Sequence, residues 1–179
     1  MKGDDDGTLV RRCLTGDRVA FERLVVRYQK PVFNAALRLL RDSEEARDVA
    51  QSAFLKAFTH LADYDANYKF YSWLYRIAIN EALHVLHQRK PLEDVSDREA
   101  DDAPGPERLV DSERIAKAMD DALMRLNPEL RAVIVLRHVL HLSYEDMSNV
   151  LQLPEKTVKS RLYTARQILR MQLLQLATT

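Results

Sequence analysis

LSYEDMSNVLQLPEKTVKSRLYTARQILRMQLL, which spans residues 142–174, contains two apolar patterns of helical spacing separated by a short break. Ser143 is placed to cap the first helix, with Asp146 three residues further on in a box-like pair. Leu153 and Pro154 supply the break, because proline cannot continue a helix. The second helix has an inner face of evenly spaced apolar residues, namely Val158, Leu162, Ala165 and Leu169. Two short helices joined by a tight turn predict a helix-turn-helix.

The outer face of the second helix predicts contact with DNA. With the apolar residues inside, about 100° per residue places these polar side chains outside: Lys156, Lys159, Ser160, Tyr163, Thr164 and Gln167. Cations neutralise phosphates, and short polar side chains reach base edges in the major groove. A merely solvated helix is the alternative, but such helices usually mix charge signs, and Glu155 is the one acid between residues 154 and 170.

The composition predicts an all-α fold. The chain has four glycines and six prolines in 179 residues, fewer turn residues than a strand-rich fold needs. The single cysteine, Cys13, excludes an internal disulfide and a cysteine-based zinc cluster. No apolar run reaches the roughly 20 residues that cross a bilayer, and the acidic start is unlike a signal peptide. We therefore expect a cytoplasmic protein.

The net charge of zero is the sum of unlike segments. Residues 1–90 carry a net charge of +3, residues 91–113 carry −7, and residues 114–179 carry +4. The middle segment also holds three prolines and a glycine and few apolar residues, which is typical of a flexible linker. The sequence thus predicts two small helical domains, residues 1–90 and 114–179, joined by the acidic linker 91–113.

The first domain reads as a bundle of four helices. Asp17 is placed to cap one helix, which Pro31 should interrupt or bend, and Asp42 to cap another over residues 43–61. A polar and aromatic loop, residues 62–69, precedes a last helix that ends in the basic run at residues 87–90. The polar face of the 43–61 helix is available to a partner.

Two sets of residues in this sequence resemble the bacterial sigma-70 family, in its extracytoplasmic function type. The first set comprises Asp48, Gln51 and Phe54, followed by Phe70, Trp73, Leu74, Arg76, Ile77, Ala78 and Asn80. The second comprises Leu126, Pro128, Arg131, Val135, Leu136, Ser143, Tyr144, Pro154, Thr157, Val158, Lys159, Ser160, Arg161, Leu162, Ala165 and Arg166. The resemblance implies a protein without a catalytic site that binds core RNA polymerase, recognises minus-ten and minus-thirty-five promoter elements and helps to melt the DNA.

The resemblance also implies roles for individual residues. It implies that the polymerase clamp helices are contacted by Glu44, Glu45, Asp48 and Gln51. It implies that the minus-thirty-five element is contacted by Lys156, Thr157, Lys159, Ser160, Arg161, Tyr163 and Thr164. A solvated acidic helix start, favoured by the helix dipole, would explain Glu44 and Glu45 equally well but would not explain Gln51.

Contact with the minus-ten element falls, by the same resemblance, to Asn67, Tyr68, Lys69, Phe70, Trp73, Arg76 and Asn80. In this family the loop before the last helix of the first domain holds an extruded base, and aromatic rings offset the cost of extrusion by stacking. For Trp73, packing in the core is an equally good interpretation. His84 and His141 stand where the family often has Asp and Gly, and histidine tolerates the left-handed conformation that the second position requires.

The implied partners are core RNA polymerase, through its clamp helices and flap, and promoter DNA. An anti-sigma factor is a common family partner, but no residue here identifies one. The linker could run toward the polymerase active centre or be a plain tether. Metal sites at the paired histidines lack a third ligand, so we expect no metal and no cofactor. Two other function classes remain as alternatives: a DNA-binding regulator whose first domain senses a ligand, and a helical adaptor that sequesters proteins.

Overall fold

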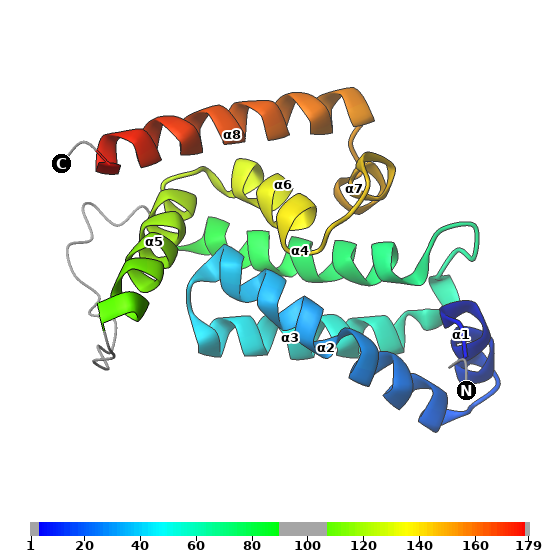
Figure 1. Cartoon of the computed structure of the whole chain (residues 1–179). Helices are drawn as coiled ribbons and strands as arrows, with labels where there is room; N and C mark the ends of the chain where they lie inside the picture. The colour runs from blue at the N-terminus through cyan, green and yellow to red at the C-terminus, as the bar shows by residue number, and fades with distance from the viewer. Residues whose placement is uncertain (1–3, 90–106, 178–179) are drawn as a thin grey trace.

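The structure, a computed structural model, describes residues 4–89 and 107–177, and every regular element within these ranges is helical (Figure 1). The first range contains α1 (Asp6–Leu14), α2 (Arg18–Leu40), α3 (Ser43–Thr59), the 3-10 turn η1 (Leu61–Asp63) and α4 (Phe70–Gln88). The second contains α5 (Glu107–Met124), α6 (Pro128–His138), α7 (Tyr144–Leu151) and α8 (Glu155–Ala177). The prediction of an all-α fold is confirmed. None of the described helices is both long and apolar enough to span a membrane.

Side-chain caps begin the helices where the sequence predicts them. The Asp17 and Asp42 carboxylates accept backbone N–H groups of α2 and α3, including that of Glu44 at 2.9 Å. Asn127 accepts the N–H of Leu130 at 2.8 Å, and Pro128 occupies the first turn of α6, where no N–H is needed. Each cap satisfies a donor that the helix itself leaves unpaired.

Three expected boundaries differ from the observed ones. Pro31 was expected to interrupt or bend its helix, and it does not interrupt it: α2 continues through Pro31 to Leu40, because residues on both sides of the proline are buried in the core. Helix α3 ends at Thr59, and η1 makes the next turn. Helix α5 begins at Glu107, inside the segment expected to be linker, and the remainder of that segment, residues 91–106, lies outside the described residues.

The helix-turn-helix forms as predicted by α7 and α8. The Ser143 hydroxyl accepts the N–H of Asp146 at 3.0 Å and caps α7. Two left-handed residues shape the connections: His141 before α7 and Gln152 after it, each with φ of 54°. His141 therefore adopts the left-handed conformation at the position where the family often has glycine. The inner face of α8 is buried at the four predicted apolar positions, residues 158, 162, 165 and 169.

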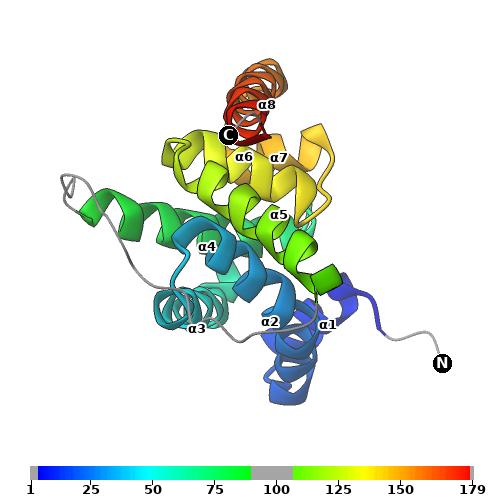
Figure 2. The ribbon, with the colours of Figure 1, turned by 60° about the vertical axis from the view of Figure 1, so that its left-hand side comes forward.

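The two halves of the chain lie against each other. Figures 1 and 2 show α4 between the α2 and α3 pair on one side and the helices α6 and α7 on the other. Buried Arg131 on α6 donates to the backbone carbonyl of Leu39 at the end of α2, and also to three carbonyls of its own half, those of Leu123, Met124 and Leu126. Burial lowers the pKa of Arg131 to about 10, which leaves the guanidinium charged at neutral pH. The sequence pattern did not predict that the two halves of the chain pack against each other.

Candidate nucleic-acid interface

The outer face of α8 is open to solvent. The side chains of Lys156, Lys159, Ser160, Tyr163 and Thr164 are exposed, and those of Thr157 and Arg161 are half-buried. Lys159 is held in place by Glu155, one turn earlier, at 2.8 Å, and its ammonium lies 5.1 Å from the centre of the Tyr144 ring. Figure 1 shows α8 on the outer side of α6 and α7, away from α4. The structure thus brings this predicted set together on one accessible basic surface.

The loop before α4 and the start of α4 form a cluster of aromatic rings. Phe70 is 2% exposed and Trp73 is 9% exposed. The Tyr64 ring lies 5.8 Å from that of Phe70 and 5.5 Å from that of Trp73. The Tyr64 hydroxyl also donates to the carbonyl of Tyr68, which closes the loop. Phe70 is a core residue in this structure, and Trp73 is mostly core with one edge free.

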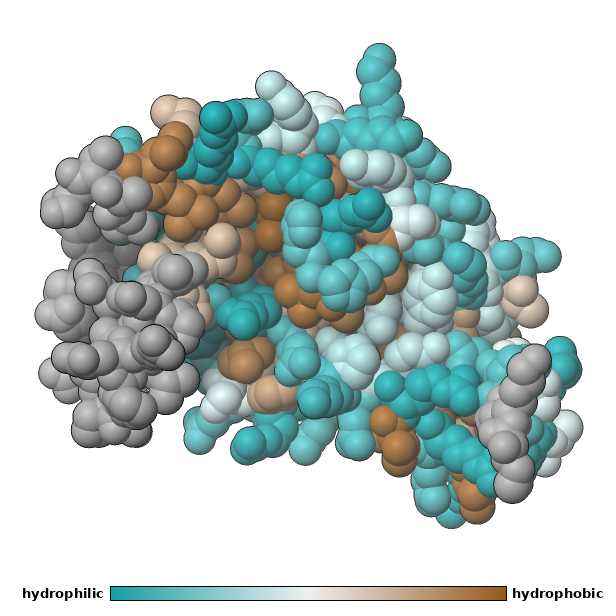
Figure 3. All heavy atoms as spheres, in the orientation of Figure 1, coloured by the Kyte–Doolittle hydropathy of each residue, from teal (hydrophilic) through white to brown (hydrophobic). Residues whose placement is uncertain are grey.

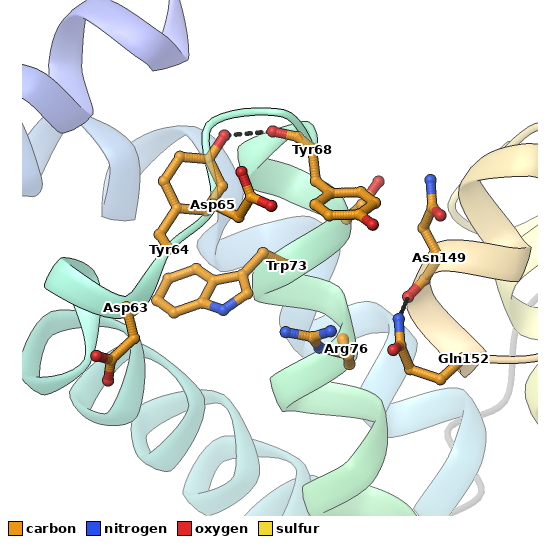
Figure 4. A pocket seen from close by; sticks show the side chains of 9 residues that line it. Asp63, Tyr64, Asp65, Tyr68, Trp73, Arg76, Asn149 and Gln152 are labelled. Atoms are coloured by element: carbon orange, nitrogen blue, oxygen red, sulfur yellow. Dashed lines mark hydrogen bonds between the residues drawn. The ribbon is translucent and has the colours of Figure 1, made fainter.

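A pocket of about 180 Å³ lies beside this cluster (Figure 4). Its lining combines rings, carboxylates and polar groups: Asp63, Tyr64, Asp65, Tyr68, Ser72, Trp73, Arg76, Asn149 and Gln152. Asn149 lies on α7 and Gln152 caps the end of that helix, and Figure 4 shows both on the side of the pocket opposite Tyr64. The sequence pattern did not single out Ser72, Asn149 or Gln152. Only the fold places them here, because residues of α7 lie some 80 positions away along the chain.

Lys69 joins the loop to the helix-turn-helix. Its ammonium lies 3.0 Å from an Asp146 carboxylate oxygen, and the same carboxylate accepts the Ser143 hydroxyl at 2.7 Å. Burial raises the pKa of Asp146, but the hydrogen bonds from Ser143, Lys69 and Tyr71 outweigh it and keep the pKa below its usual value. Hydrogen bonds to Tyr71 and Asp146 raise the pKa of Lys69. One of the predicted DNA cations is therefore engaged within the protein.

The other predicted minus-ten residues are more accessible. Asn67 is exposed at the tip of the loop, where its backbone N–H donates to Asp65 at 2.9 Å. Asn80 is exposed on α4, and Arg76 is half-buried one turn before it. His84, at the family's aspartate position, is exposed and lies 2.8 Å from the side-chain nitrogen of Gln88.

The face of α3 carries the predicted polymerase contacts. Glu44, Asp48 and Gln51 are exposed, whereas Glu45 is half-buried and forms an ion pair with Arg89 of α4. Beside Gln51, α2 and α3 form a groove of about 590 Å³. Its lining is Val25, Gln29, Lys30, Phe33, Arg47, Ala50, Gln51 and Phe54. Phe33 and Phe54 are half-buried in this groove, which the sequence pattern did not predict.

A second apolar groove, of about 760 Å³, lies between α5, α6 and α8. Its apolar lining is Ala116, Met119, Leu123, Ile134, Val139, Leu169, Leu173 and Leu174, and three arginines, Arg38, Arg166 and Arg170, line it as well. Figure 3 shows apolar side chains gathered in the hollow below α8. Exposed apolar patches of this kind mark surfaces at which proteins associate.

Comparison with known proteins identifies both halves. The family model for Sigma-70 region 2 matches residues 24–91, and that for Sigma-70, region 4 matches residues 116–169. The RNA polymerase sigma-H factor of Pseudomonas aeruginosa is 38% identical over 92% of this chain and 91% of its own. The ECF RNA polymerase sigma-E factor of Escherichia coli K12 is 37% identical over 90% of this chain and 91% of its own.

Solved structures share the fold. CnrH, in complex with the cytosolic domain of CnrY, has a TM-score of 0.75 and 27% identity over 95% of this chain and 97% of its own. The sigma factor RpoE from Bartonella quintana, in complex with the anti-sigma factor NepR, has a TM-score of 0.66 and 22% identity over 86% of this chain and 96% of its own. The chain belongs to the sigma-70 family, as a sigma factor of the extracytoplasmic function type that acts in transcription initiation.

Proposed function

We propose that this sigma factor divides promoter recognition between two surfaces, α8 for the minus-thirty-five element and the loop with α4 for the minus-ten element. The exposed face of α8 supplies cations for phosphates and short polar groups for base edges, which is the combination that major-groove readers use. Both halves act in the cytoplasm with core polymerase, and the protein contributes binding energy rather than a catalytic group.

The observation that carries this proposal is the pocket beside Trp73. A base that leaves the duplex loses its stacking, and a pocket lined by rings returns part of that free energy. Tyr64, Tyr68 and Trp73 provide such rings next to exposed Asn67. We assign the pocket to an extruded base of the nontemplate strand, with Arg76 and Asn80 on the adjoining surface of α4 for the backbone or neighbouring bases.

Polymerase docking is assigned to α3 and to the groove beside it. Asp48 and Gln51 offer acceptors to basic and amide groups, and Phe33 and Phe54 offer apolar contact. Charged groups give orientation and buried apolar area gives affinity, so the groove explains more of the binding than the acidic face alone. The groove between α5, α6 and α8 is assigned to the polymerase flap, and an anti-sigma factor would compete for such surfaces.

Transcription in vitro tests this assignment. Purified chain, core polymerase and a promoter library should give promoter-specific transcripts, and 2-aminopurine in the minus-ten element should gain fluorescence when the base leaves the stack. Specific binding of duplex DNA by the protein alone, with no transcript on adding polymerase, would instead indicate a conventional DNA-binding regulator.

A further inference from the structure

Ser72 has a buried hydroxyl without a partner. The residue is 2% exposed, and its Oγ makes no hydrogen bond with any described residue. It lies in the first turn of α4 and lines the pocket of about 180 Å³ beside Trp73. Buried polar groups are almost always paired, because an unpaired one loses its hydrogen bond to water and gains nothing in return. Ser72 is such an exception in the lining of a pocket, and a ligand bound there would supply the missing partner.

Ser72 does not use the acceptors that a helical serine usually takes. A serine in a helix normally donates to the carbonyl three or four residues before it. The carbonyl of Tyr68 accepts the Tyr64 hydroxyl, and the carbonyl of Lys69 accepts the backbone N–H groups of Ser72 and Trp73. The loop therefore leaves the Ser72 hydroxyl for a group that enters the pocket.

The other residues that line the pocket indicate which kind of ligand can bind beside Ser72. Tyr64, Tyr68 and Trp73 supply ring surfaces that favour a flat aromatic ligand. Asp63 and Asp65, which also line the pocket, disfavour a phosphate by charge repulsion. A neutral, planar group with polar edges fits both conditions, and a nucleobase has these properties.

We infer that Ser72 reads the identity of the extruded base through a hydrogen bond from its Oγ to a polar atom on the base edge. A hydroxyl both donates and accepts, so it pairs with a carbonyl oxygen, a ring nitrogen or an amino group, and it rejects a base that presents a carbon at the same point. A site built to hydrogen-bond discriminates strongly because a wrong base leaves the buried group unpaired. This inference rests on the proposed function of the pocket.

The test uses the chain assembled with core polymerase and single-stranded minus-ten oligonucleotides carrying each base at each position. For the wild-type protein we expect a clear base preference at the extruded position. Ser72→Ala should reduce that preference by roughly tenfold and leave the preferences at the other positions unchanged. Ser52→Ala is the matched control, because Ser52 is a half-buried serine that donates to Glu81 at 3.0 Å on the neighbouring helix.

Thermal unfolding of the free chain separates a reading role from a structural one. Ser72→Ala removes a hydroxyl that makes no bond in the protein, so its Tm should equal or exceed that of the wild type. A lower Tm, or an unchanged base preference at every position, would overturn the inference. If the wild-type protein itself shows no base preference and no 2-aminopurine signal, the failure lies with the proposed function of the pocket instead.

Discussion

The ammonium of Lys69 and the carboxylate of Asp146 lie 3.0 Å apart, although 77 residues separate them in the chain. The contact connects the loop that precedes α4 with the first turn of α7. Lys69 is exposed over 60% of its side chain and Asp146 over 8%. Lys69, which is predicted to contact the minus-ten element, therefore also contacts the helix-turn-helix.

Lys69→Ala should loosen the contact between the halves. A half-exposed ion pair contributes up to about 1 kcal/mol, so the ratio of closed to open molecules should fall by up to roughly fivefold, and high salt should have a similar effect on the wild type. Fluorescent labels at Arg47→Cys and Gln167→Cys, in a Cys13→Ser background, report the separation. Lys56→Ala is the control, since Lys56 pairs with Glu81 inside one half. Identical distances in all variants at every salt concentration would contradict the prediction.

Arg131→Met should destabilise the protein strongly. Arg131 is 4% exposed and its guanidinium donates to four backbone carbonyls, so the substitution removes four charge-assisted hydrogen bonds from the interior. We expect a loss of about 3 kcal/mol in the free energy of unfolding by urea. Arg125→Met, at an exposed position in the connection between α5 and α6, should change it by less than roughly 0.5 kcal/mol. Equal effects of the two substitutions would show that the carbonyl network contributes nothing.

His138 should make stability depend on pH. Burial and then the charges of Arg166, Arg137 and His141 lower the pKa of His138 below its ordinary 6.5. The unfolded chain therefore binds a proton more readily, so this stability is complete above pH 6.5 and is lost as the pH falls through 6.5 and on to the lower folded value. Urea midpoints between pH 8 and 5 measure the effect. His138→Gln should flatten the profile, and a profile identical to that of the wild type would contradict the prediction.

Asp48→Arg should weaken binding of core polymerase by at least about tenfold, because it reverses a charge on the exposed face of α3. Pull-down of purified core polymerase measures the effect. Glu145→Arg makes the same charge reversal at an exposed position of α7 and should leave polymerase binding unchanged. A wild-type yield with Asp48→Arg would remove α3 from the docking surface.

Lys159→Glu should weaken promoter binding by the holoenzyme by about tenfold and reduce the salt dependence of binding by roughly one counterion. The substitution reverses a charge on the exposed face of α8 and also places a second acid near Glu155. Filter binding at several salt concentrations measures both quantities. Lys117→Glu, on α5, is the matched control. Affinity for core polymerase should stay at the wild-type value in both variants.

The sequence predicted the helices because their signals are local. Caps at Asp17, Asp42, Asn127 and Ser143 and apolar residues at helical spacing act within a few positions of the chain, so they are readable without the fold. Pro31 left two outcomes open, an interruption or a bend, and the helix is not interrupted because packing on both sides of the proline outweighs its local cost.

The candidate site was predictable only in part. The face of α8 follows directly from the helical period, and it is exposed as expected. The Trp73 pocket depends on a meeting of α4 with α7, and its Ser72, Asn149 and Gln152 carry no distinguishing pattern of their own. Arg131 is similar: its spacing along α6 shows only that it faces inward, and the four carbonyls to which it donates come from two distant parts of the chain, residue 39 and residues 123–126.

The contact of α4 with α7 limits how far apart the two DNA-reading surfaces can lie. Elements at minus ten and minus thirty-five are separated by about 25 base pairs, or about 85 Å of B-form DNA at roughly 3.4 Å per base pair. The longest described helices, α2 and α8, have 23 residues each, about 35 Å at roughly 1.5 Å per residue. We therefore expect that, while Lys69 contacts Asp146, the two proposed DNA-binding surfaces lie too close together to occupy both elements. We also expect core polymerase to hold the two halves further apart when the promoter is bound.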